Sequence, residues 1–341
     1  MVTVSIIVLN WNGKHFLKDC LHSLQKLSYP KVELIVVDNN STDESQEFVK
    51  KKYPHIKLIE NKENVGFAEG NNIGYRASKG EYIMFLNNDT VVTPNFLEPL
   101  LEDFKKDSQV GCIQPQIQLK GDPGVLDGVG AFLTPTGFLY HFGYLKKRDD
   151  KKYSQKLKIF SAKGACMMLS RKVIQKVGAF DKDFFIFFEE TDLCYRVWLA
   201  GYSVQYESDS VIYHVGGGDT GTSNSYKYAR RTYLSFRNMV CSYLKNFSTY
   251  NLLTIFPLFI FLLSGLCVYY CLTRRFHLAK VILEGYLWNI TNLSSTLQKR
   301  KIIQKKLRKI SDRELNKHIM KFPKLTYYYA LFTARLKDFQ D

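Results

Sequence analysis

Residues 81–90 read EYIMFLNNDT, an apolar run of strand length that ends in two asparagines and an aspartate. Residues 2–9 and 32–37 are β-branched, apolar runs of the same kind, and each is followed by polar side chains. Such runs are typical of strands buried on both faces of a sheet. Between the runs at 2–9 and 32–37, residues 14–27 carry apolar side chains at helical spacing. Strand and helix alternating at this spacing predict right-handed crossovers and a mostly parallel sheet.

The alternation continues along the chain, with one interruption. Residues 107–160 carry Gly, Pro and Asp without clear periodicity, so we expect irregular loops and short hairpins there. The further strands that we expect are 56–59, 81–86, 160–170 and 211–214, the last followed by a glycine loop at 216–218. The further helices that we expect are one opened by the capping-box pattern at 41–44, then 67–78, one starting at Thr93-Pro94, and 189–200.

Polar side chains follow three of the expected strands at the point where each ends. Asn10 and Asp38 follow the first two, and Asn87-Asn88-Asp89 follows the strand at 81–86. Ligands of parallel sheets bind at the carboxyl ends of the strands. These residues therefore mark one edge of the sheet as the expected ligand-binding edge.

Two of these positions have both a chemical and an ordinary structural interpretation. Asp38 can accept the imide N–H of a uracil or thymine ring, or it can cap the next helix. Asp89, flanked by amides, can bind Mg²⁺ or Mn²⁺, which are hard ions that prefer oxygen ligands. The alternative for Asp89 is a simple turn, because Asn and Asp are favoured turn residues.

A group of carboxylates follows an aromatic run at 187–192, which reads FFEETD. Aromatic neighbours and like charge raise the pKa of a carboxylate, so Glu189 or Glu190 could serve as a base at neutral pH. The alternative is that the acidic side chains complement the N-terminus of a helix. His214 ends a later strand on what we expect to be the same rim, as a ligand or as a structural histidine.

The charge of the 341-residue chain is unevenly distributed. The net charge is +16, but residues 1–219 hold 27 basic and 27 acidic side chains, whereas residues 220–341 hold 21 basic and 5 acidic ones. This pattern favours a neutral domain, placed at 1–222, and a basic helical region at 223–341. It argues against a uniformly basic nucleic-acid binder.

The basic region contains an apolar segment, 252–272, whose 21 residues are enough to span about 30 Å of hydrocarbon as a helix. It is followed by the basic cluster 298–309, which has no interleaved aromatic residues of the kind that bind nucleic acid. Basic clusters beside apolar segments favour anionic lipid headgroups. The segment therefore crosses a bilayer, lies in its surface, or packs on the main domain as a buried helical hairpin.

The seven cysteines are odd in number and scattered along the chain. The apolar opening stretch is too short for a signal core and lacks a basic leader. We therefore expect a reducing compartment, with buried or free thiols.

Six segments, in this order, together resemble family-2 glycosyltransferases with a GT-A fold, and in particular their rhamnosyltransferase-like branch. They are VSIIVLNWNG (4–13), VDNNSTD (37–43), ENVGFAEGNNIG (63–74), EYIMFLNNDT (81–90), KGACMMLSR (163–171) and FFEETDLCYR (187–196). The resemblance implies an α/β fold, with a Rossmann-like, mostly parallel sheet flanked by helices. It also implies a C-terminal helical extension that associates with the membrane.

The resemblance assigns the donor-binding residues. Asn10 and Asp38 would hold the nucleotide base. The rest of the nucleotide-sugar pocket would be lined by Asn64, Asn72 and Asn88.

The resemblance also assigns the metal site and the base. Asp89 stands at the metal-binding position of the family's DxD motif, whose first position is Asn87 here, and His214 stands at the second metal or diphosphate contact. Glu190 stands at the catalytic base, and Glu189 is the reserve for that role. The implied cofactor is Mg²⁺ or Mn²⁺.

These assignments lead to an expected reaction. Glu190 would deprotonate an acceptor hydroxyl, which displaces a nucleoside diphosphate in one inverting step while the cation neutralises the leaving group. The expected donor is dTDP- or UDP-linked, with dTDP-rhamnose first, and the acceptor is a glycan or a polyprenyl-diphosphate-linked intermediate at the cytoplasmic face of the cell membrane. The competing interpretations are a nucleotidyltransferase acting on sugar phosphates and a non-enzymatic membrane scaffold.

Overall fold

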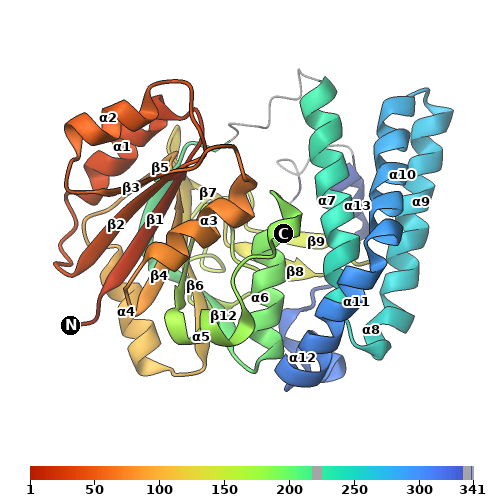
Figure 1. The fold of residues 1–341 in the computed structure, drawn as a ribbon. Coiled ribbons are helices and arrows are strands. Elements are labelled where there is room, and N and C mark those ends of the chain that lie inside the picture. Colours follow the sequence, from red (N-terminus) through yellow and green to blue (C-terminus); the bar gives the residue numbers. More distant parts are fainter. Residues whose placement is uncertain (217–224, 333–338, 340–341) are drawn as a thin grey trace.

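The computed structural model describes residues 1–216, 225–332 and 339 of the chain. A mixed ten-stranded sheet forms its centre, and a layer of long helices stands beside the sheet (Figure 1). The boundary expected between 222 and 223 lies outside the described residues, as does most of the glycine loop expected at 216–218.

The first 90 residues form the parallel half of the sheet, as predicted. The strands run in the order β4-β1-β2-β3, and each neighbouring pair is parallel. In this register Asn10 is paired with Asp38, and Leu9 with Asn87. The elements are β1 (Val4–Asn10), α1 (Lys14–Leu24), β2 (Val32–Asp38), α2 (Ser45–Lys52), β3 (Lys57–Glu60), α3 (Gly66–Ala77) and β4 (Tyr82–Asn87).

Side chains of the central strands enter two separate cores. Ile6 and Val8 of β1 pack in the core that includes α1 and α2, whereas Ile7 packs in the core that includes α3 and α6. Burial on both faces explains the continuous apolar runs that predicted these strands.

The prediction of irregular loops and short hairpins at 107–160 is confirmed for the short antiparallel hairpin of Gly130–Leu133 and Leu139–Phe142, but it misses a long strand. This region holds the ten-residue strand β6 (Val110–Leu119), which is buried along nearly all of its length, and several shorter strands. Three buried glutamines, Gln114, Gln116 and Gln118, break its apolar pattern. Gln114 Nε2 donates to the carbonyls of Gly128 and Val129, at 3.1 Å each, so burial leaves this amide satisfied.

The second half of the sheet is mixed, because β11 runs antiparallel to both β4 and β6 while β12 runs parallel to β6. Its elements are β5 (Thr90–Val92), α4 (Leu97–Lys106), β6 (Val110–Leu119), β7 (Asp122–Gly128), β8 (Gly130–Leu133), β9 (Leu139–Phe142), β10 (Leu157–Lys158), β11 (Cys166–Ser170), α5 (Arg171–Val177), the 3₁₀ turn η1 (Lys182–Phe184), α6 (Glu189–Leu199) and β12 (Ser203–His214).

Two helices begin later than their cap signals predict, because tertiary contacts use the capping side chains. Thr93 Oγ1 donates to the carbonyl of Val211 on β12, at 2.9 Å, so α4 begins at Leu97. Ser41 Oγ donates to Asp38 Oδ2, at 2.7 Å, so α2 begins at Ser45. The strand expected at 160–170 is likewise shorter, since Ser161 bridges to Ala131 outside the main sheet.

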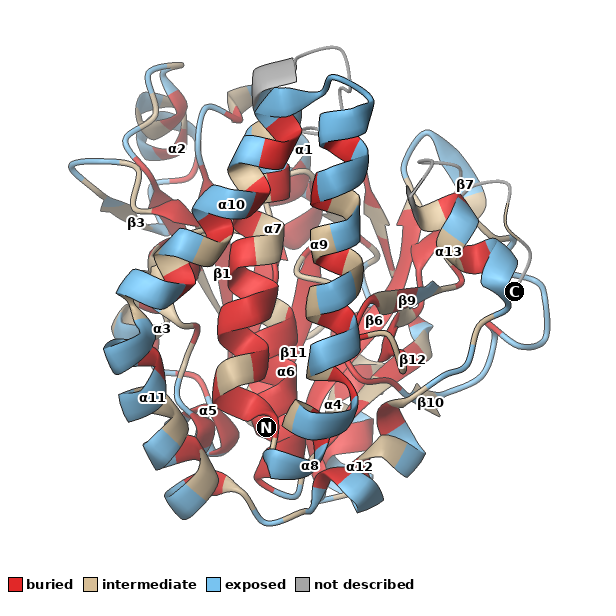
Figure 2. Ribbon diagram, turned by 90° about the vertical axis from the view of Figure 1, so that its right-hand side faces the viewer, coloured by how far each residue is buried: buried red, intermediate tan, exposed pale blue. Residues whose placement is uncertain are grey.

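The C-terminal region is helical, as predicted. Figure 2 shows α7 largely buried behind α9 and α10, whose outer faces are exposed. The helices are α7 (Ser225–Asn246), α8 (Thr249–Thr254), α9 (Phe256–Leu272), α10 (Phe276–Thr291), α11 (Leu293–Ile302), a π-helical turn (Ile303–Leu307), α12 (Asp312–Ile319) and α13 (Leu325–Phe332).

The apolar segment at 252–272 is divided between α8 and α9, which meet at Ile255. One side of α9 is buried, and Phe259 packs against Phe138 with ring centroids 5.2 Å apart. Within the described parts of the chain, no helix combines the length and the apolar character needed to cross a membrane.

Candidate active site

Asp38 and Asn10 lie side by side at the carboxyl ends of β2 and β1. The buried Asp38 carboxylate accepts hydrogen bonds from Asn10 Nδ2 at 2.8 Å, Ser41 N at 2.8 Å, Ser41 Oγ at 2.7 Å and Gln46 Nε2 at 2.7 Å. Asp38 thus organises the loop before α2 but does not cap that helix, which begins at Ser45. The parallel register explains why two residues 28 positions apart meet here.

Asn88 joins this pair from the neighbouring strand. Its Nδ2 donates to Asn10 Oδ1 at 2.6 Å, and a Cβ atom added at Gly13 would lie only 2.1 Å from the same nitrogen. Asn88 and Asp89 form the tight turn between β4 and β5. The backbone therefore matches the turn interpretation, and this turn places two candidate site residues at one edge of the sheet.

His214 connects Asp89 to a residue that the sequence did not identify, Asp127. Its Nε2 lies 3.2 Å from Asp89 Oδ1, and its Nδ1 lies 2.6 Å from Asp127 Oδ2. Lys163 then pairs with Asp127 Oδ1 at 2.6 Å. Asp127 lies in β7, within the region that lacked periodicity. Lys163 begins the segment KGACMMLSR (163–171), but nothing in that segment indicated an ion pair with Asp127.

These contacts set the charge of the group. Burial disfavours the imidazolium, but the hydrogen bond to Asp127 and the nearby Asp89 carboxylate outweigh burial and raise the pKa of His214 to about 9. Burial also opposes the charge of Asp127, yet His214 and Lys163 hold the pKa of its carboxyl below the usual range. The cluster therefore combines two carboxylates with two cations at neutral pH.

Glu189 and Glu190 open helix α6. Burial raises the pKa of Glu190 to about 7, and the backbone N–H groups of Glu190 and Thr191 and the charge of Lys163 oppose that rise. Burial together with the charge of Glu190 raises the pKa of Glu189 well above its ordinary value. A Cβ atom added at Gly164 would lie 3.8 Å from the Cβ and Cδ atoms of Glu190, so this carboxyl lies beside the Lys163–Gly164 backbone.

Asn64 and Asn72 hold backbone in the structure. Asn64 Oδ1 accepts from Gly66 N at 2.9 Å. Asn72 donates from Nδ2 to Phe180 O at 2.9 Å and accepts at Oδ1 from Phe180 N at 3.0 Å. Their expected contact with the nucleotide sugar stays a prediction.

Most of the predicted residues, but not Asn64 and Asn72, thus belong to a nearly continuous series of contacts that also includes Asp127 and Lys163. It runs from Asp38 through Asn10 and Asn88 to the Asp89 turn, and from there through His214, Asp127 and Lys163 to the segment beside Glu190. Among the described residues, no group of three or more His, Cys, Asp or Glu side chains is arranged to hold a metal ion by itself.

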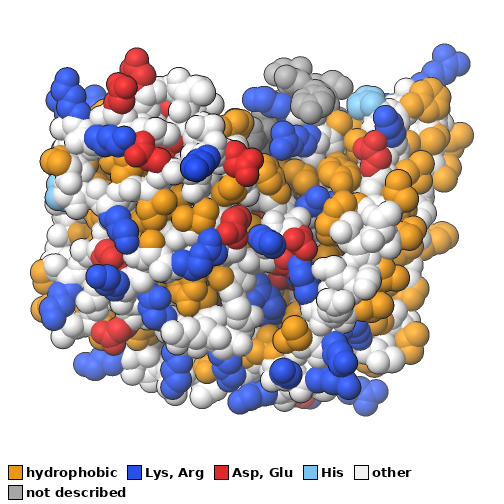
Figure 3. Space-filling model, viewed as in Figure 1, with side chains coloured by type: hydrophobic (Ala, Val, Ile, Leu, Met, Phe, Trp, Pro, Cys, Tyr) orange, Lys and Arg blue, Asp and Glu red, His pale blue; other side chains and the backbone are white. Residues whose placement is uncertain are grey.

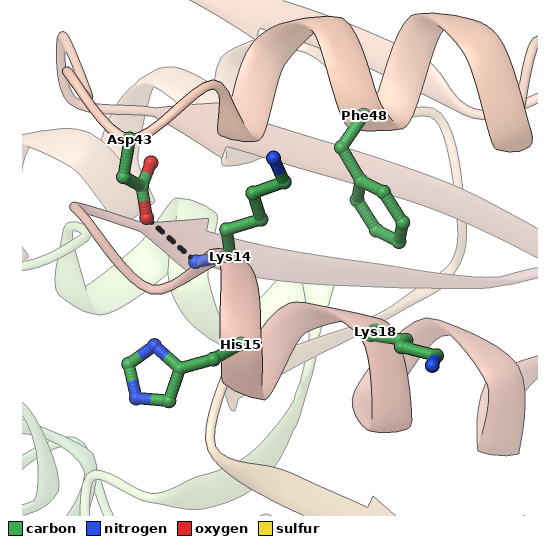
Figure 4. Close-up of a pocket in the computed structure, with 5 residues that line it drawn as sticks. All are labelled: Lys14, His15, Lys18, Asp43 and Phe48. Carbon is green, nitrogen blue, oxygen red and sulfur yellow. Dashed lines mark hydrogen bonds between the residues drawn. The ribbon is translucent and has the colours of Figure 1, made fainter.

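A separate hollow of about 410 Å³ lies between α1 and α2 (Figure 4). Asp43 Oδ2 accepts from the backbone N–H of Lys14 at 2.8 Å on one side of it. Its lining residues are Lys14, His15, Lys18, Asp43 and Phe48. None of the candidate site residues lines it.

The fold and the edge residues together define a class of protein. The family model described as glycosyl transferase family 2 matches residues 5–178, and the chain belongs to this family. The match favours glycosyl transfer over the nucleotidyltransferase and scaffold interpretations.

Two curated relatives are sugar-transferring enzymes by name. The low-salt glycan biosynthesis hexosyltransferase Agl10 of Haloferax volcanii is 29% identical over 248 residues, which are 69% of this chain and 73% of the relative. The poly-β-1,6-N-acetyl-D-glucosamine synthase of Staphylococcus epidermidis is 25% identical over 208 residues, 60% of this chain. The match covers 48% of that synthase, so the chain spans about half its length.

Solved structures share the fold at low sequence identity. GalNAc-T7, determined with UDP, GalNAc and Mn²⁺, superposes with a TM-score of 0.59 at 18% identity, over 74% of this chain and 49% of that one. The mannosyltransferase PcManGT from Pyrobaculum calidifontis, in complex with GDP-Man and Mn²⁺, gives a TM-score of 0.55 at 15% identity, over 99% of this chain and 88% of that one. These likenesses support a GT-A-like fold.

Proposed function

We propose that the protein transfers a single sugar from a nucleoside-diphosphate donor to an acceptor hydroxyl, with inversion at the anomeric carbon. The observation that carries this proposal is the series of contacts along one sheet edge, from Asp38 to the segment beside Glu190. This series would bring a candidate nucleobase-binding carboxylate, a candidate metal position and a candidate general base to the edge where parallel sheets bind ligands.

In this proposal Glu190 acts as the general base. It takes the proton of the acceptor hydroxyl as that oxygen forms a bond to the anomeric carbon, and the bond from this carbon to the diphosphate oxygen breaks with its electron pair. A pKa raised to about 7 by burial suits a base at neutral pH. Glu189 has a pKa raised further, by burial and by the charge of Glu190, so it is the weaker candidate.

The two potential metal ligands, Asp89 and His214, fit a small divalent cation. Asp89 Oδ1 is buried and has no hydrogen bond of good geometry, although it lies 3.2 Å from His214 Nε2. Neighbouring ligands of an octahedral ion are about 3 Å apart, which this separation matches. Asp127 on Nδ1 would orient the ring, as carboxylates commonly do for metal-binding histidines. A cation held there would replace the Nε2 proton of His214, because only a neutral imidazole can be a ligand, and it would neutralise the leaving diphosphate.

We propose Mn²⁺ ahead of Mg²⁺ for this position. The reason is the nitrogen ligand, because Mg²⁺ takes oxygen ligands almost exclusively. With two side chains available, phosphate oxygens and water would complete the coordination shell.

For the nucleobase of the donor we propose uracil or thymine, bound at Asp38. The carboxylate already accepts four hydrogen bonds, so the imide N–H must displace one donor. Gln46 Nε2 is on the longest of the donating side chains and is the one that we expect to yield. For the sugar we propose rhamnose from dTDP-rhamnose, on the basis of the sequence resemblance, with UDP-N-acetylglucosamine as the alternative raised by the synthase relative.

We further propose that the protein works at the cytoplasmic face of the membrane, on a glycan or polyprenyl-diphosphate-linked acceptor. Hydrophobic side chains gather along the side of the molecule formed by α9 and α10 (Figure 3). An exposed apolar surface of this extent is unusual for a face that contacts only water. Arg274 and Arg275 lie in the turn between the two helices, where they could contact anionic lipid headgroups. The large exposed residues on these helices are Leu258, Phe261, Val268, Tyr269, Leu272, Phe276, Leu283, Leu287 and Ile290.

A donor screen tests the proposed function. Purified protein is incubated with dTDP-rhamnose, UDP-N-acetylglucosamine and GDP-mannose, with Mn²⁺, Mg²⁺ or chelator, and thermal stabilisation and nucleoside diphosphate release are measured. We expect a dTDP- or UDP-linked donor to stabilise the protein in the presence of Mn²⁺, and Asp38→Asn to lose that stabilisation. Binding confined to the GDP donor, or none with any donor, would contradict the proposal.

A further inference from the structure

The segment that leads into Glu189 and Glu190 has an unusual backbone. Phe185, Phe187 and Phe188 have φ angles of +62°, +72° and +71°. The backbone of L-residues other than glycine rarely adopts this left-handed region. Three cases in four consecutive residues need stabilising contacts from other parts of the protein. We refer to residues 185–188 as the aromatic loop.

Asn238 of α7 supplies this support. Its buried Nδ2 donates to the carbonyls of Phe184 at 2.9 Å, Ile186 at 3.1 Å and Phe187 at 2.7 Å. One amide group therefore gathers three carbonyls from four consecutive residues. The conformation of the aromatic loop depends on a side chain that lies more than 50 positions further along the chain.

Arg237 orients that amide. Its Nε donates to Asn238 Oδ1 at 2.8 Å, which leaves the Nδ2 hydrogens facing the loop. Its Nη2 donates to the carbonyls of Asp183 at 2.7 Å and Phe184 at 3.0 Å, just before the loop. The guanidinium also lies 4.5 Å from the ring centroid of Trp288 on α10, which fixes its plane.

The aromatic loop also contacts the start of helix α3. Phe185 O accepts from Phe67 N at 2.6 Å and from Ala68 N at 3.1 Å, at the start of α3. A change in the loop would therefore move both the start of α6 and its contact with α3.

Other bonds already join α7 to α6. Ser242 Oγ and Asn246 Nδ2 each donate to Asp192 Oδ1 at 2.8 Å, and Lys245 Nζ lies 3.1 Å from the same oxygen. These contacts hold the body of α6. The Nδ2 bonds of Asn238 instead go only to the backbone ahead of the helix.

We propose that Asn238, oriented by Arg237, is a positioning residue for Glu190. It holds the aromatic loop in a strained conformation that sets where the first turn of α6, and with it the Glu190 carboxyl, lies. This inference rests on the proposed function, because it assigns Glu190 the role of base.

Two substitutions at Asn238 test the proposal. Asn238→Ala removes the amide, and Asn238→Asp keeps its shape and the bond from Arg237 while replacing the donor. Asn251→Ala is the matched control, because Asn251 is equally buried but bonds to Asn316, away from the loop. The measurements are kcat, the donor KM, and hydrogen exchange of the 185–188 amides.

We expect both Asn238 variants to lose roughly 10- to 100-fold in kcat, with a smaller change in donor KM, because the loop leads directly into Glu190 whereas Asn10 and Asp38 lie on β1 and β2. Exchange at 185–188 should accelerate in these variants only, and Asn251→Ala should keep the wild-type kcat. Wild-type kcat in folded Asn238→Asp, or unchanged exchange in the loop, would overturn the proposal. A wild-type protein that transfers no sugar would count against the proposed function instead. The exchange measurement would still test whether Asn238 holds the aromatic loop.

Discussion

His214 Nε2 lies 3.2 Å from Asp89 Oδ1, so the end of β12 meets the turn after β4 at a histidine–carboxylate pair. The other ring nitrogen is held by Asp127. Once Nε2 has lost its proton, Nε2 and Oδ1 are the two atoms placed to hold the cation that we propose for this edge of the sheet.

The first prediction concerns metal-dependent donor binding. Asp89→Asn keeps the size of the side chain but removes the charged ligand. The factor by which Mn²⁺ increases the affinity for UDP or dTDP should therefore be at least about tenfold smaller in this variant than in the wild type. Titration calorimetry with and without Mn²⁺ measures this difference. Asp122→Asn, at an exposed position on β7, is the control. An unchanged response to Mn²⁺ in Asp89→Asn would remove Asp89 from the metal site.

The second prediction concerns pH. Glu190 acts as a base only when it is ionised, and burial raises its pKa to about 7 against the opposing charge of Lys163. We therefore expect kcat to rise with pH through about 7 and to level off above it. Turnover measured from about pH 5 to about pH 9 checks this limb. A profile that is flat through this range would contradict the assignment.

The same raised pKa predicts how stability depends on pH. The folded protein holds the Glu190 proton more tightly than the unfolded chain, in which the carboxyl titrates near 4.5. Between about 4.5 and about 7 the unfolded state binds fewer protons, so this group makes the free energy of unfolding fall as pH rises. Glu190→Gln should make that dependence shallower in urea unfolding experiments.

The third prediction concerns the ion pairs of Lys245 on α7, which join it to Asp181 before the 3₁₀ turn and to Asp192 on α6. Buried Lys245 lies 2.5 Å from Asp181 and 3.1 Å from Asp192. Burial opposes the charge of both carboxyls, yet Lys245 helps to hold their pKa values below the usual range. Replacing one partner of a buried pair leaves an uncompensated charge, which costs roughly 3–5 kcal/mol.

For Lys245→Met we expect a loss at the lower end of that range, because Lys299 still pairs with Asp181 at 2.6 Å. Urea unfolding measures the loss. Lys280→Met is the matched control, since Lys280 is exposed and its pair with Glu284 is worth little. Equal stability of the two variants would show that the buried network contributes nothing specific.

The fourth prediction concerns the apolar face of α9 and α10. Arg274→Gln with Arg275→Gln should weaken binding to vesicles containing anionic lipid by roughly 30-fold, at about 1 kcal/mol per charge near the surface. Co-sedimentation measures binding, and Lys105→Gln with Lys106→Gln on α4 is the matched control. Replacing Leu283, Leu287 and Ile290 by serine should weaken binding to neutral vesicles as well. Wild-type protein that ignores both kinds of vesicle would contradict a membrane-facing role.

The parallel half of the fold could be predicted because its signals are local. The apolar runs of β1, β2 and β4 and the helical spacing of α1 are readable in short windows, and register alone then places Asn10 beside Asp38. Strand β6 could not be predicted, because its buried glutamines resemble exposed polar residues until their hydrogen-bond partners are known, such as the carbonyls of Gly128 and Val129 for Gln114.

The site was predictable to the same extent. Asp89, His214 and Glu190 lie at ends of elements with recognisable patterns, whereas the link between them passes through Asp127, which lies in a strand with no clear periodicity. The contact of Asn238 with the aromatic loop depends on the packing of α7, which no local pattern specifies.

The most direct test of the account is the turnover of Glu190→Gln, with Glu189→Gln alongside and the donor dissociation constant measured for both. The account predicts that Glu190→Gln loses at least about 100-fold in transfer, as expected when a general base is removed, and binds the donor as the wild type does. Glu189→Gln should lose less. Undiminished turnover in Glu190→Gln would contradict the role of Glu190 and the proposed mechanism with it.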